Sequence, residues 1–390
     1  KNGPIVPLIA ETGGMNAMIV DATALPEQVA DDVVSSAFRS AGQRCSALRC
    51  LYVQKDIAPH LTEMLTGAMD ELAIGDPWHL ATDIGPVIDA EAEAGIRAHV
   101  EAARAEGRVI KELKRPAQGY FVAPAVIRVR GIADLKREVF GPVLHLATFE
   151  ADELPMVVAT INATGYGLTF GLHSRIDNRV DEVTSALHAG NIYVNRNQIG
   201  AVVGSQPFGG EGLSGTGPKA GGPDYLTRFT APVPVEATEA PAATAVKSIW
   251  IQKALGRLRE SEPMARRDLP GPTGETNRLS FYRRAPLVCL GPDTAAQARA
   301  VRDLGGSAVE APGIEPSDLL TLEGFSGVLW WGGDAKGRAY VLALAQRRGP
   351  ILPLITALPD RAHVAHERHV CVDTTASGGN AALLAEAGSA

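Results

Sequence analysis

The sequence predicts an α/β protein built in two parts, and three observations support this fold class. In the first part, apolar stretches typical of strands at 17–22 and 48–54 flank residues 26–42, whose apolar positions recur at helical spacing. In the second part, strand-like and helix-like stretches alternate, a rhythm typical of a parallel sheet. Between the parts, residues 231–245 are almost wholly Ala, Pro, Thr, Val and Glu, which predicts a linker.

Composition excludes several classes of protein. The 390 residues suit two or three domains, and the 45% of hydrophobic residues can fill their cores. A net charge of −7, with no run of Lys or Arg longer than two, argues against nucleic-acid binding. The four cysteines form no CxxC pair, and the histidines near residue 366 have no zinc-site pattern, so we expect neither a disulfide framework nor a structural metal. Arginines and prolines interrupt the apolar stretch 341–358, so no membrane span is expected.

The first part contains a cysteine in an unusual setting. We expect the helix that begins at Pro26 to end at Gly42, and the strand 48–54 to follow. Cys45 lies between them among small, polar and basic residues, and the arginine beside it favours the thiolate. Cys50 lies inside the strand, where packing is the simplest interpretation. Cys45 is therefore the candidate nucleophile.

The second part predicts a Rossmann-like module. Its expected strands are 285–291, 325–333 and 350–358, and its expected helices are 294–306 and 335–349. The GGD at 332–334 lies between a strand and a helix, but it lacks the spaced glycines and the acidic partner of a dinucleotide site. We therefore expect this module to hold no cofactor.

A nucleophilic thiol needs a group that activates water and donors that stabilise an oxyanion. Glu11 stands before Gly13 and Gly14, in a tight turn where the backbone can approach a ligand closely. Taken alone, the glycine-rich stretches at 167–175 and 208–222 indicate only turns, and no Walker motif occurs.

Taken together, these stretches resemble the aldehyde dehydrogenase superfamily. The motifs that carry the resemblance occur in the family's order and spacing: ETGG at 11–14, GQRCS at 42–46, EVFGPVL at 138–144, GYGLT at 165–169 and PFGGEGLSG at 207–215. Longer stretches, among them AETGGMNAMIVD, GTGPKAGGP and the closing VDTTASGGNAALL, resemble the L-glutamate γ-semialdehyde (1-pyrroline-5-carboxylate) dehydrogenase portion of the bifunctional proline utilization A flavoenzymes. The resemblance covers nearly the whole chain and is weaker between about 236 and 365.

The resemblance implies roles for individual residues. Cys45 matches the nucleophile that forms a thiohemiacetal with the aldehyde, and Glu11 matches the residue that activates water to hydrolyse the resulting thioester. Glu138 and Phe140 match contacts to the nicotinamide ribose of NAD, the implied cofactor. Without the resemblance, Glu11 is a turn carboxylate and EVFGPV is a strand that enters a turn.

The implied substrate carries an α-carboxylate, which backbone N–H groups of a glycine turn can bind without a basic side chain. In this subfamily the donors match Ser46, Gly221 and Gly222, and Phe229 matches an aromatic that flanks the aliphatic part. By themselves these residues are a serine, a turn and a core phenylalanine. Asn195 and Asn197 are expected to brace their loop.

The resemblance also implies a domain layout. It comprises a remnant of an upstream NAD-binding domain at 1–10, an aldehyde dehydrogenase catalytic domain at 11–230, the linker 231–245, and a Rossmann-like lid domain with the closing motif at 246–390. The lid is expected to cover a tunnel that carries the semialdehyde from an upstream proline dehydrogenase portion, which holds FAD. Most of the NAD site and the oxyanion asparagine are expected upstream, so we expect the 390-residue segment alone to be inactive and prone to aggregate.

Three functional hypotheses remain. The first is NAD-dependent oxidation of glutamate semialdehyde in the cytoplasm, in a protein whose full-length relatives can associate peripherally with the membrane. The second is a non-catalytic scaffold and lid that acts only within a full bifunctional polypeptide. The third, oxidation of an aliphatic or methylmalonate semialdehyde, is disfavoured by the GTGPKAGGP loop. Family members differ in oligomeric state, so a homo-oligomer remains open.

Overall fold

The computed structural model describes residues 5–6, 8–235, 246–256 and 262–375. The chain divides into two compact units. The larger unit comprises residues 12–206, 268–278 and 369–390, and the smaller unit comprises residues 1–11, 207–267 and 279–368. This division differs from the sequential boundaries expected from the sequence, because residues 207–230 group with the C-terminal segments. Residues 236–245 of the expected linker lie outside the described residues.

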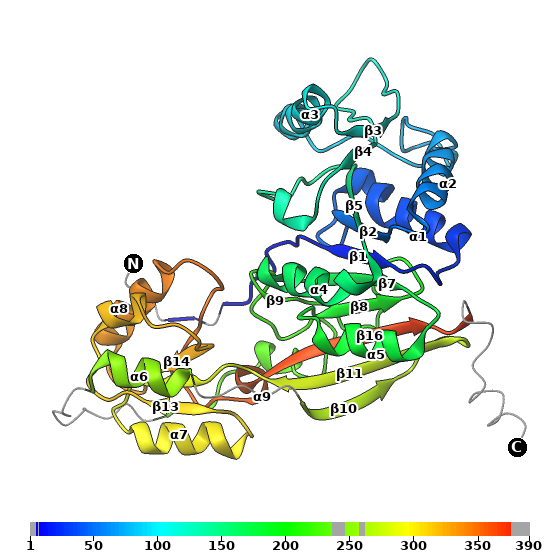
Figure 1. The fold of residues 1–390 in the computed structure, drawn as a ribbon. Helices are drawn as coiled ribbons and strands as arrows, with labels where there is room; N and C mark the ends of the chain where they lie inside the picture. Colours follow the sequence, from blue (N-terminus) through cyan, green and yellow to red (C-terminus); the bar gives the residue numbers. More distant parts are fainter. Residues whose placement is uncertain (1–4, 7, 236–245, 257–261, 376–390) are drawn as a thin grey trace, which may run out of the picture. The chain divides into compact units, whose positions relative to one another are not determined.

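A ten-stranded sheet has its strands in the order β10-β11-β16-β8-β7-β1-β2-β5-β4-β3 (Figure 1), and the strands from β8 to β3 form the framework of the larger unit. The central pairs from β16 to β4 are parallel, and β3 closes the edge antiparallel to β4. The strands are β1 (Ala17–Val20), β2 (Cys50–Gln54), β3 (Val109–Glu112), β4 (Ala125–Arg128), β5 (Val143–Phe149), β7 (Thr169–His173), β8 (Asn191–Val194), β10 (Pro263–Leu269), β11 (Glu275–Arg283) and β16 (Ala365–Asp373). The short strands β6 (Tyr166–Gly167) and β9 (Glu211–Gly212) lie outside this sheet.

Helices pack on this sheet. They are α1 (Pro26–Phe38), α2 (Ala58–Asp70), α3 (Ala90–Ala105), α4 (Leu154–Ala163) and α5 (Asp177–Ala186), with short 3-10 helices η1 (Arg39–Gly42), η2 (Ile132–Asp134) and η3 (Ala151–Glu153). Helices α1 and α2 lie side by side (Figure 1). The core strands β1 and β2 are buried over their whole length, which is why they read as continuous apolar runs in the sequence.

The smaller unit contains a second, parallel sheet, with strands in the order β13-β12-β14-β15. Its elements are α6 (Ser248–Leu255), β12 (Leu287–Cys289), α7 (Thr294–Asp303), β13 (Ala308–Glu310), β14 (Gly327–Leu329), α8 (Asp334–Ala345), β15 (Leu354–Ile355) and α9 (Arg361–Val364), with 3-10 helices η4 (Leu226–Phe229) and η5 (Pro316–Leu320). Asp293 begins α7 by accepting a hydrogen bond from Ala296 N–H at 2.9 Å. The predicted α/β fold is confirmed, including the alternation of strands and helices in the second part.

One expected boundary is wrong. Helix α1 ends at Phe38 and not at Gly42, because Ser40 and Ala41 adopt left-handed backbone conformations with φ of 55° and 53°. Gly42 follows with φ of 65°, and a Cβ there would lie 2.1 Å from the carbonyl oxygen of Gly141. This close approach requires glycine and turns the chain sharply before Cys45.

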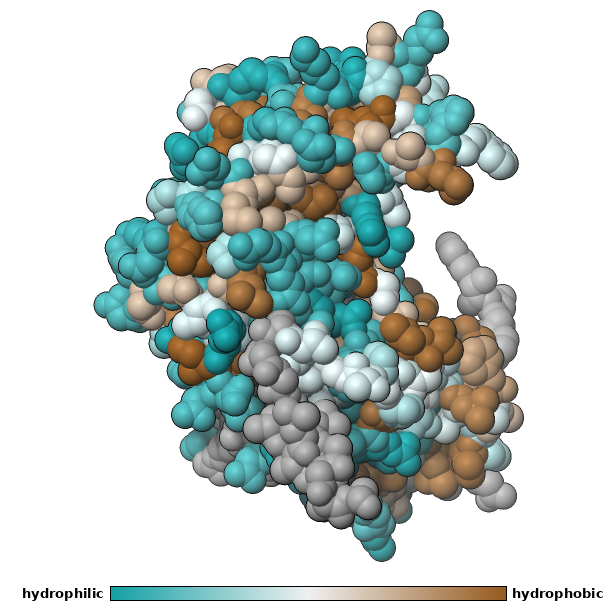
Figure 2. All heavy atoms as spheres, turned by 90° about the vertical axis from the view of Figure 1, so that its right-hand side faces the viewer, coloured by the Kyte–Doolittle hydropathy of each residue, from teal (hydrophilic) through white to brown (hydrophobic). Residues whose placement is uncertain are grey.

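The remaining features of the fold concern membrane spans, metal sites, the cysteines and the surface. Within the described residues, no helix is long and apolar enough to cross a membrane, and no group of three or more His, Cys, Asp or Glu side chains is arranged to hold a metal ion. All four cysteines are free thiols. On the face drawn in Figure 2, apolar residues occur singly among hydrophilic ones and also gather toward the lower right of the view.

Candidate functional site

The eight residues proposed from the sequence divide equally between the two units. Cys45, Ser46, Glu138 and Phe140 belong to the larger unit, and Glu11, Gly221, Gly222 and Phe229 belong to the smaller one. Each set is described below within its own unit.

In the larger unit, the turn that carries Cys45 is held by side chains from neighbouring strands. The Asn16 amide, just before β1, donates to the carbonyl oxygens of Cys45 at 2.7 Å and of Ala47 at 2.9 Å. The hydroxyl of Thr169 and the amide of Gln198 donate to the carbonyl oxygen of Ser46 at 3.1 and 3.3 Å. Three consecutive carbonyls therefore receive side-chain donors, which fixes a turn that has no regular secondary structure.

The two cysteines of this region have different surroundings. Cys45 is partly exposed, as a nucleophile must be, whereas Cys50 on β2 is fully buried. Burial raises the pKa of the Cys50 thiol far above its usual range, so Cys50 is chemically inert at neutral pH. Ser46 is only 5% exposed, and its carbonyl is one of the three that anchor the turn.

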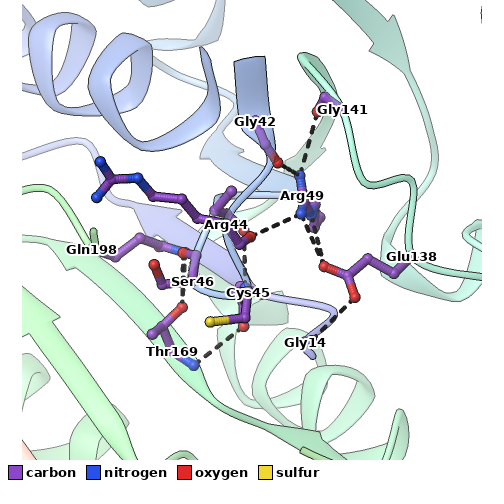
Figure 3. A network of polar contacts seen from close by, with 12 residues as sticks. Gly14, Gly42, Arg44, Cys45, Ser46, Arg49, Glu138, Gly141, Thr169 and Gln198 are labelled. Carbon is purple, nitrogen blue, oxygen red and sulfur yellow. Dashed lines mark hydrogen bonds and ion pairs between the residues drawn. The ribbon is translucent and has the colours of Figure 1, made fainter. Parts of the chain in front are cut away.

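Arg49 connects this turn to Glu138 (Figure 3). Its guanidinium is completely buried and donates to the carbonyls of Gly42 (2.7 Å), Gly141 (3.3 Å) and Arg44 (3.0 Å) and twice to Oε1 of Glu138 (2.9 and 3.2 Å). These bonds use all five N–H donors of an arginine. Burial lowers the pKa of Arg49, and the Glu138 carboxylate opposes that shift, so the guanidinium stays charged.

The guanidinium also interacts electrostatically with Cys45. The sequence analysis assigned such an influence to Arg44, whose Nε donates to the Ser40 hydroxyl at 3.0 Å. A positive charge near a thiol favours the thiolate, the form that attacks a carbonyl carbon.

Glu138 and Phe140 lie at one edge of this network. The second carboxylate oxygen of Glu138 accepts from Gly14 N–H at 3.3 Å, and a Cβ at Gly13 would lie 2.6 Å from that oxygen. The Phe140 ring has its centroid 5.2 Å from the Arg49 guanidinium carbon and is 45% exposed. A fixed carboxylate with an exposed aromatic ring beside it suits a ligand that has both hydroxyls and a flat ring.

A pocket of about 400 Å³ opens beside these two residues. Gln43 and the first turns of α3 line its other side, and the Gln43 side chain accepts from Ile88 N–H at 2.8 Å and donates to the Pro86 carbonyl at 3.3 Å. The volume lies in the range of small-ligand sites. Glu138, Phe140 and this pocket therefore fit the ribose and nicotinamide end of NAD.

In the smaller unit, Lys219 is the central residue. Its ammonium donates to the Gly209 carbonyl at 2.7 Å, and its backbone N–H donates to Oε2 of Glu367 at 2.8 Å. A Cβ at Gly209 would lie 3.4 Å from Cγ of Lys219 and 3.7 Å from Oε1 of Glu11, so both side chains lie against the same side of Gly209. Partial burial raises the pKa of Glu11, and the charge of Lys219 opposes that shift.

The glycine turn proposed to bind a carboxylate follows Lys219. Gly221 has φ of 71°, with open space where a Cβ would stand. The Gly222 N–H donates to the Lys219 carbonyl at 3.0 Å, so this donor is already used inside the turn. Phe229 on η4 is 71% exposed and packs edge-on against Tyr225, so it is not the core phenylalanine of the alternative interpretation.

The sequence analysis missed Asn16, Arg49 and Lys219 as site residues. Asn16 and Lys219 lie inside quoted motifs, and Arg49 lies in the expected strand 48–54. The signal was a polar side chain next to or within a buried apolar strand, or within a glycine-rich loop. Asn195 does brace its loop as expected, because its amide exchanges hydrogen bonds with the backbone of Ser174.

Replacement of Asn16 tests whether its amide holds the turn. Asn16→Asp preserves size and the acceptor for Thr169 N–H but loses the donor to two carbonyls, so we expect a loss of unfolding free energy of about 1–3 kcal/mol. Denaturant unfolding and the rate of Cys45 alkylation measure the effect. A variant as stable as the parent, with unchanged alkylation, would show that the amide is dispensable.

A double-mutant cycle tests the Arg49–Glu138 pair. Arg49→Met alone leaves Glu138 and three carbonyls without their donor, and we expect it to destabilise the protein by about 3 kcal/mol or more. Glu138→Gln alone should cost less, and the double variant should cost less than the sum of the two. Additive losses in thermal or denaturant unfolding would contradict a direct coupling.

Comparison with known proteins identifies relatives of the chain. The model of the "Aldehyde dehydrogenase family" matches residues 1–234. The chain is 42% identical over 446 residues to "Bifunctional protein PutA" of Escherichia coli, covering 98% of this chain and 34% of that protein. It is 38% identical over 227 residues to "1-pyrroline-5-carboxylate dehydrogenase" of Geobacillus kaustophilus, covering 56% of this chain and 43% of that protein. The chain thus spans about a third of the length of its PutA relatives.

Solved structures agree. A crystal structure of Bradyrhizobium japonicum proline utilization A (PutA), mutant D779Y, has a TM-score of 0.57 at 59% identity and covers 59% of this chain and 24% of that one. A 1-pyrroline-5-carboxylate dehydrogenase from Thermus, solved with bound NAD, has a TM-score of 0.53 at 36% identity over 57% of this chain and 43% of that one. With a family model that matches more than half of its residues, the chain belongs to the aldehyde dehydrogenase family.

Proposed function

We propose that this chain is the catalytic part of an NAD-dependent L-glutamate γ-semialdehyde dehydrogenase that acts in proline catabolism. The observation that carries the proposal is the partly exposed Cys45, on a turn whose carbonyls are held and whose neighbouring cation is the buried Arg49. The likeness to relatives named PutA and 1-pyrroline-5-carboxylate dehydrogenase supports the choice of substrate.

The chemistry assigns a role to each residue. The Cys45 thiolate attacks the aldehyde carbon and forms a thiohemiacetal, whose oxidation gives a thioester on the sulfur. NAD supplies the acceptor for the hydride, and Glu138 and Phe140 would hold its ribose and nicotinamide. Glu11 then takes a proton from water as the oxygen attacks the thioester carbon, which releases glutamate and restores the thiolate.

The substrate carboxylate is assigned to the glycine turn. We place it at the backbone around Gly221, with Ser46 as a further donor and Phe229 against the aliphatic part. Gly222 contributes room, because its N–H is engaged and a Cβ there would lie 2.9 Å from Oε1 of Glu367. We further propose that the natural polypeptide joins this part to a proline dehydrogenase portion, as the word bifunctional in the names of its relatives suggests.

Removal of the thiol tests the nucleophile. In the full-length protein, Cys45→Ala should abolish NADH formation from 1-pyrroline-5-carboxylate, because no other group can form the thioester. The matched control is Cys50→Ala, which removes a fully buried thiol and should leave turnover measurable. Turnover that survives in Cys45→Ala and disappears in Cys50→Ala would reverse the assignment, and the absence of turnover in the unmodified protein would favour a non-catalytic scaffold.

A substitution in the glycine turn tests the substrate class. Gly222→Val should displace Glu367 and crowd the turn, which weakens transition-state binding of the semialdehyde by about 2 kcal/mol. A short aldehyde without a carboxylate should lose less kcat/KM. If both substrates lose equally, the turn does not bind the carboxylate.

A further inference from the structure

The charged side chains around Lys219 are a second cluster that the sequence did not predict. Lys219 is only 2% exposed and lies near the acidic residues Glu11, Glu211 and Glu367. Arginines satisfy part of this acidic charge: Arg368 pairs with Glu211 at 2.7 Å, and Arg361 pairs with Asp224 at 2.7 Å. His366 also lies 3.6 Å from Glu211, and the half-buried Arg284 interacts with both Glu211 and Glu367.

The backbone of the loop keeps Lys219 against Gly209. The N–H and carbonyl of Ala220 exchange hydrogen bonds with Phe208 at 2.8 and 3.0 Å, and the Lys219 ammonium closes the loop on the Gly209 carbonyl. Glu11 is attached to the same loop, because Thr216 N–H donates to the Ala10 carbonyl at 3.0 Å and the Thr216 hydroxyl accepts from Ala10 N–H at 3.0 Å. The amine and the carboxylate are therefore held near each other by hydrogen-bonded backbone on both sides.

We propose that Lys219 is a positioning residue that keeps Glu11 ionised, and thereby able to accept the proton of the hydrolytic water. The proposal rests on the proposed function in one respect, the role of Glu11 as the base. A base must be in its carboxylate form before water arrives, and partial burial works against that form. Lys219 supplies the opposing charge, and Glu367 and Glu211 stabilise the ammonium in its buried position.

The sign of the effect follows from this arrangement. Removal of the Lys219 charge leaves the burial of Glu11 unopposed, so the pKa of Glu11 rises and a smaller fraction is ionised at a given pH. The acid limb of thioester hydrolysis then moves to higher pH. We expect the acid limb to move by about 0.5 pH unit or more. This is less than the pKa shift that a close, buried ion pair causes, because Glu11 is exposed on one side and solvent screens its charge.

The test uses hydrolysis of p-nitrophenyl acetate by the full-length protein, which needs neither NAD nor the semialdehyde. The ester acylates a reactive thiol with release of nitrophenolate, and water then hydrolyses the thioester to acetate. The steady-state rate after the first turnover, measured from pH 5 to 8, reports the hydrolytic step. Lys219→Met should raise the pH of half-maximal rate, and Lys219→Arg should restore it toward the parent value.

A control and a second variant keep the test decisive. Arg228→Met removes another cation of the same unit, paired with Asp360 at 2.6 Å, and should leave the acid limb in place. If Lys219→Met does not fold, Glu367→Gln serves, because it weakens the stabilisation of the ammonium and should also move the limb upward. If Glu367 instead acted directly on Glu11, loss of its negative charge would lower the pKa of Glu11 and move the acid limb to lower pH.

The outcomes separate the inference from the proposed function. An even loss of rate across the pH range in Lys219→Met, or a downward or absent move in Glu367→Gln, overturns the role of Lys219. Ester hydrolysis with a shifted limb but no oxidation of the semialdehyde overturns the proposed substrate and supports the inference. A Glu11→Gln variant with an unchanged limb overturns both the base and its partner.

Discussion

The buried guanidinium of Arg49 is the interaction on which the larger unit's site depends. A charge removed from water is tolerated only when it is paired and its donors are satisfied, and Arg49 meets both conditions by binding Glu138 and three backbone carbonyls. The carbonyls come from both sides of the site, Gly42 and Arg44 before the nucleophile and Gly141 after the EVF motif. One side chain thus fixes the distance between the turn of Cys45 and the carboxylate proposed to bind the cofactor. A shift of either segment would leave a buried charge or a buried carbonyl without its partner.

The left-handed turn before Cys45 places the Gly42 carbonyl where Arg49 donates to it. Helix α1 ends at Phe38, where Arg39 leaves the helical conformation, and the next three residues, 40–42, have positive φ. The Gly42 carbonyl at the end of this turn accepts a hydrogen bond from Arg49. Such conformations are costly for Ser40 and Ala41, so the surrounding contacts must compensate. The hydrogen bonds from Asn16, Thr169 and Gln198 to the carbonyls of residues 45–47 contribute to that compensation. Backbone strain and a well-held nucleophile are therefore two aspects of the same local structure.

The sequence predicted β1 and β2 of the large sheet and β12, β14 and β15 of the small one, because buried parallel strands are continuous apolar runs, but it left the other strands of both sheets unassigned. It also distinguished the nucleophile candidate Cys45 from the packing residue Cys50, because small polar neighbours and an apolar strand can be recognised from the sequence alone. It did not predict where α1 ends, because the apolar spacing of 26–42 continues past Phe38 and the cause is the tertiary approach of Gly141. The partners of Arg49 and Lys219 could not be predicted either, because these contacts also form only in the folded structure. Glu138 lies 89 positions after Arg49, and Glu367 lies 148 positions after Lys219. Motif resemblance named the residues proposed to touch substrate, but not the side chains that hold them.

The two buried cations differ in a way that suits their different tasks. Arginine stays charged in almost any protein environment and offers five donors in a rigid plane, which suits a permanent connection between several acceptors. Lysine offers a single compact charge whose protonation responds to burial and to neighbouring carboxylates, and burial lowers the pKa of Lys219 while Glu367, Glu211 and Glu11 raise it. A guanidinium at position 49 therefore fixes geometry. An amine at position 219 places one compact charge against the Gly209 carbonyl, close to Glu11, the carboxylate for which we propose the role of base.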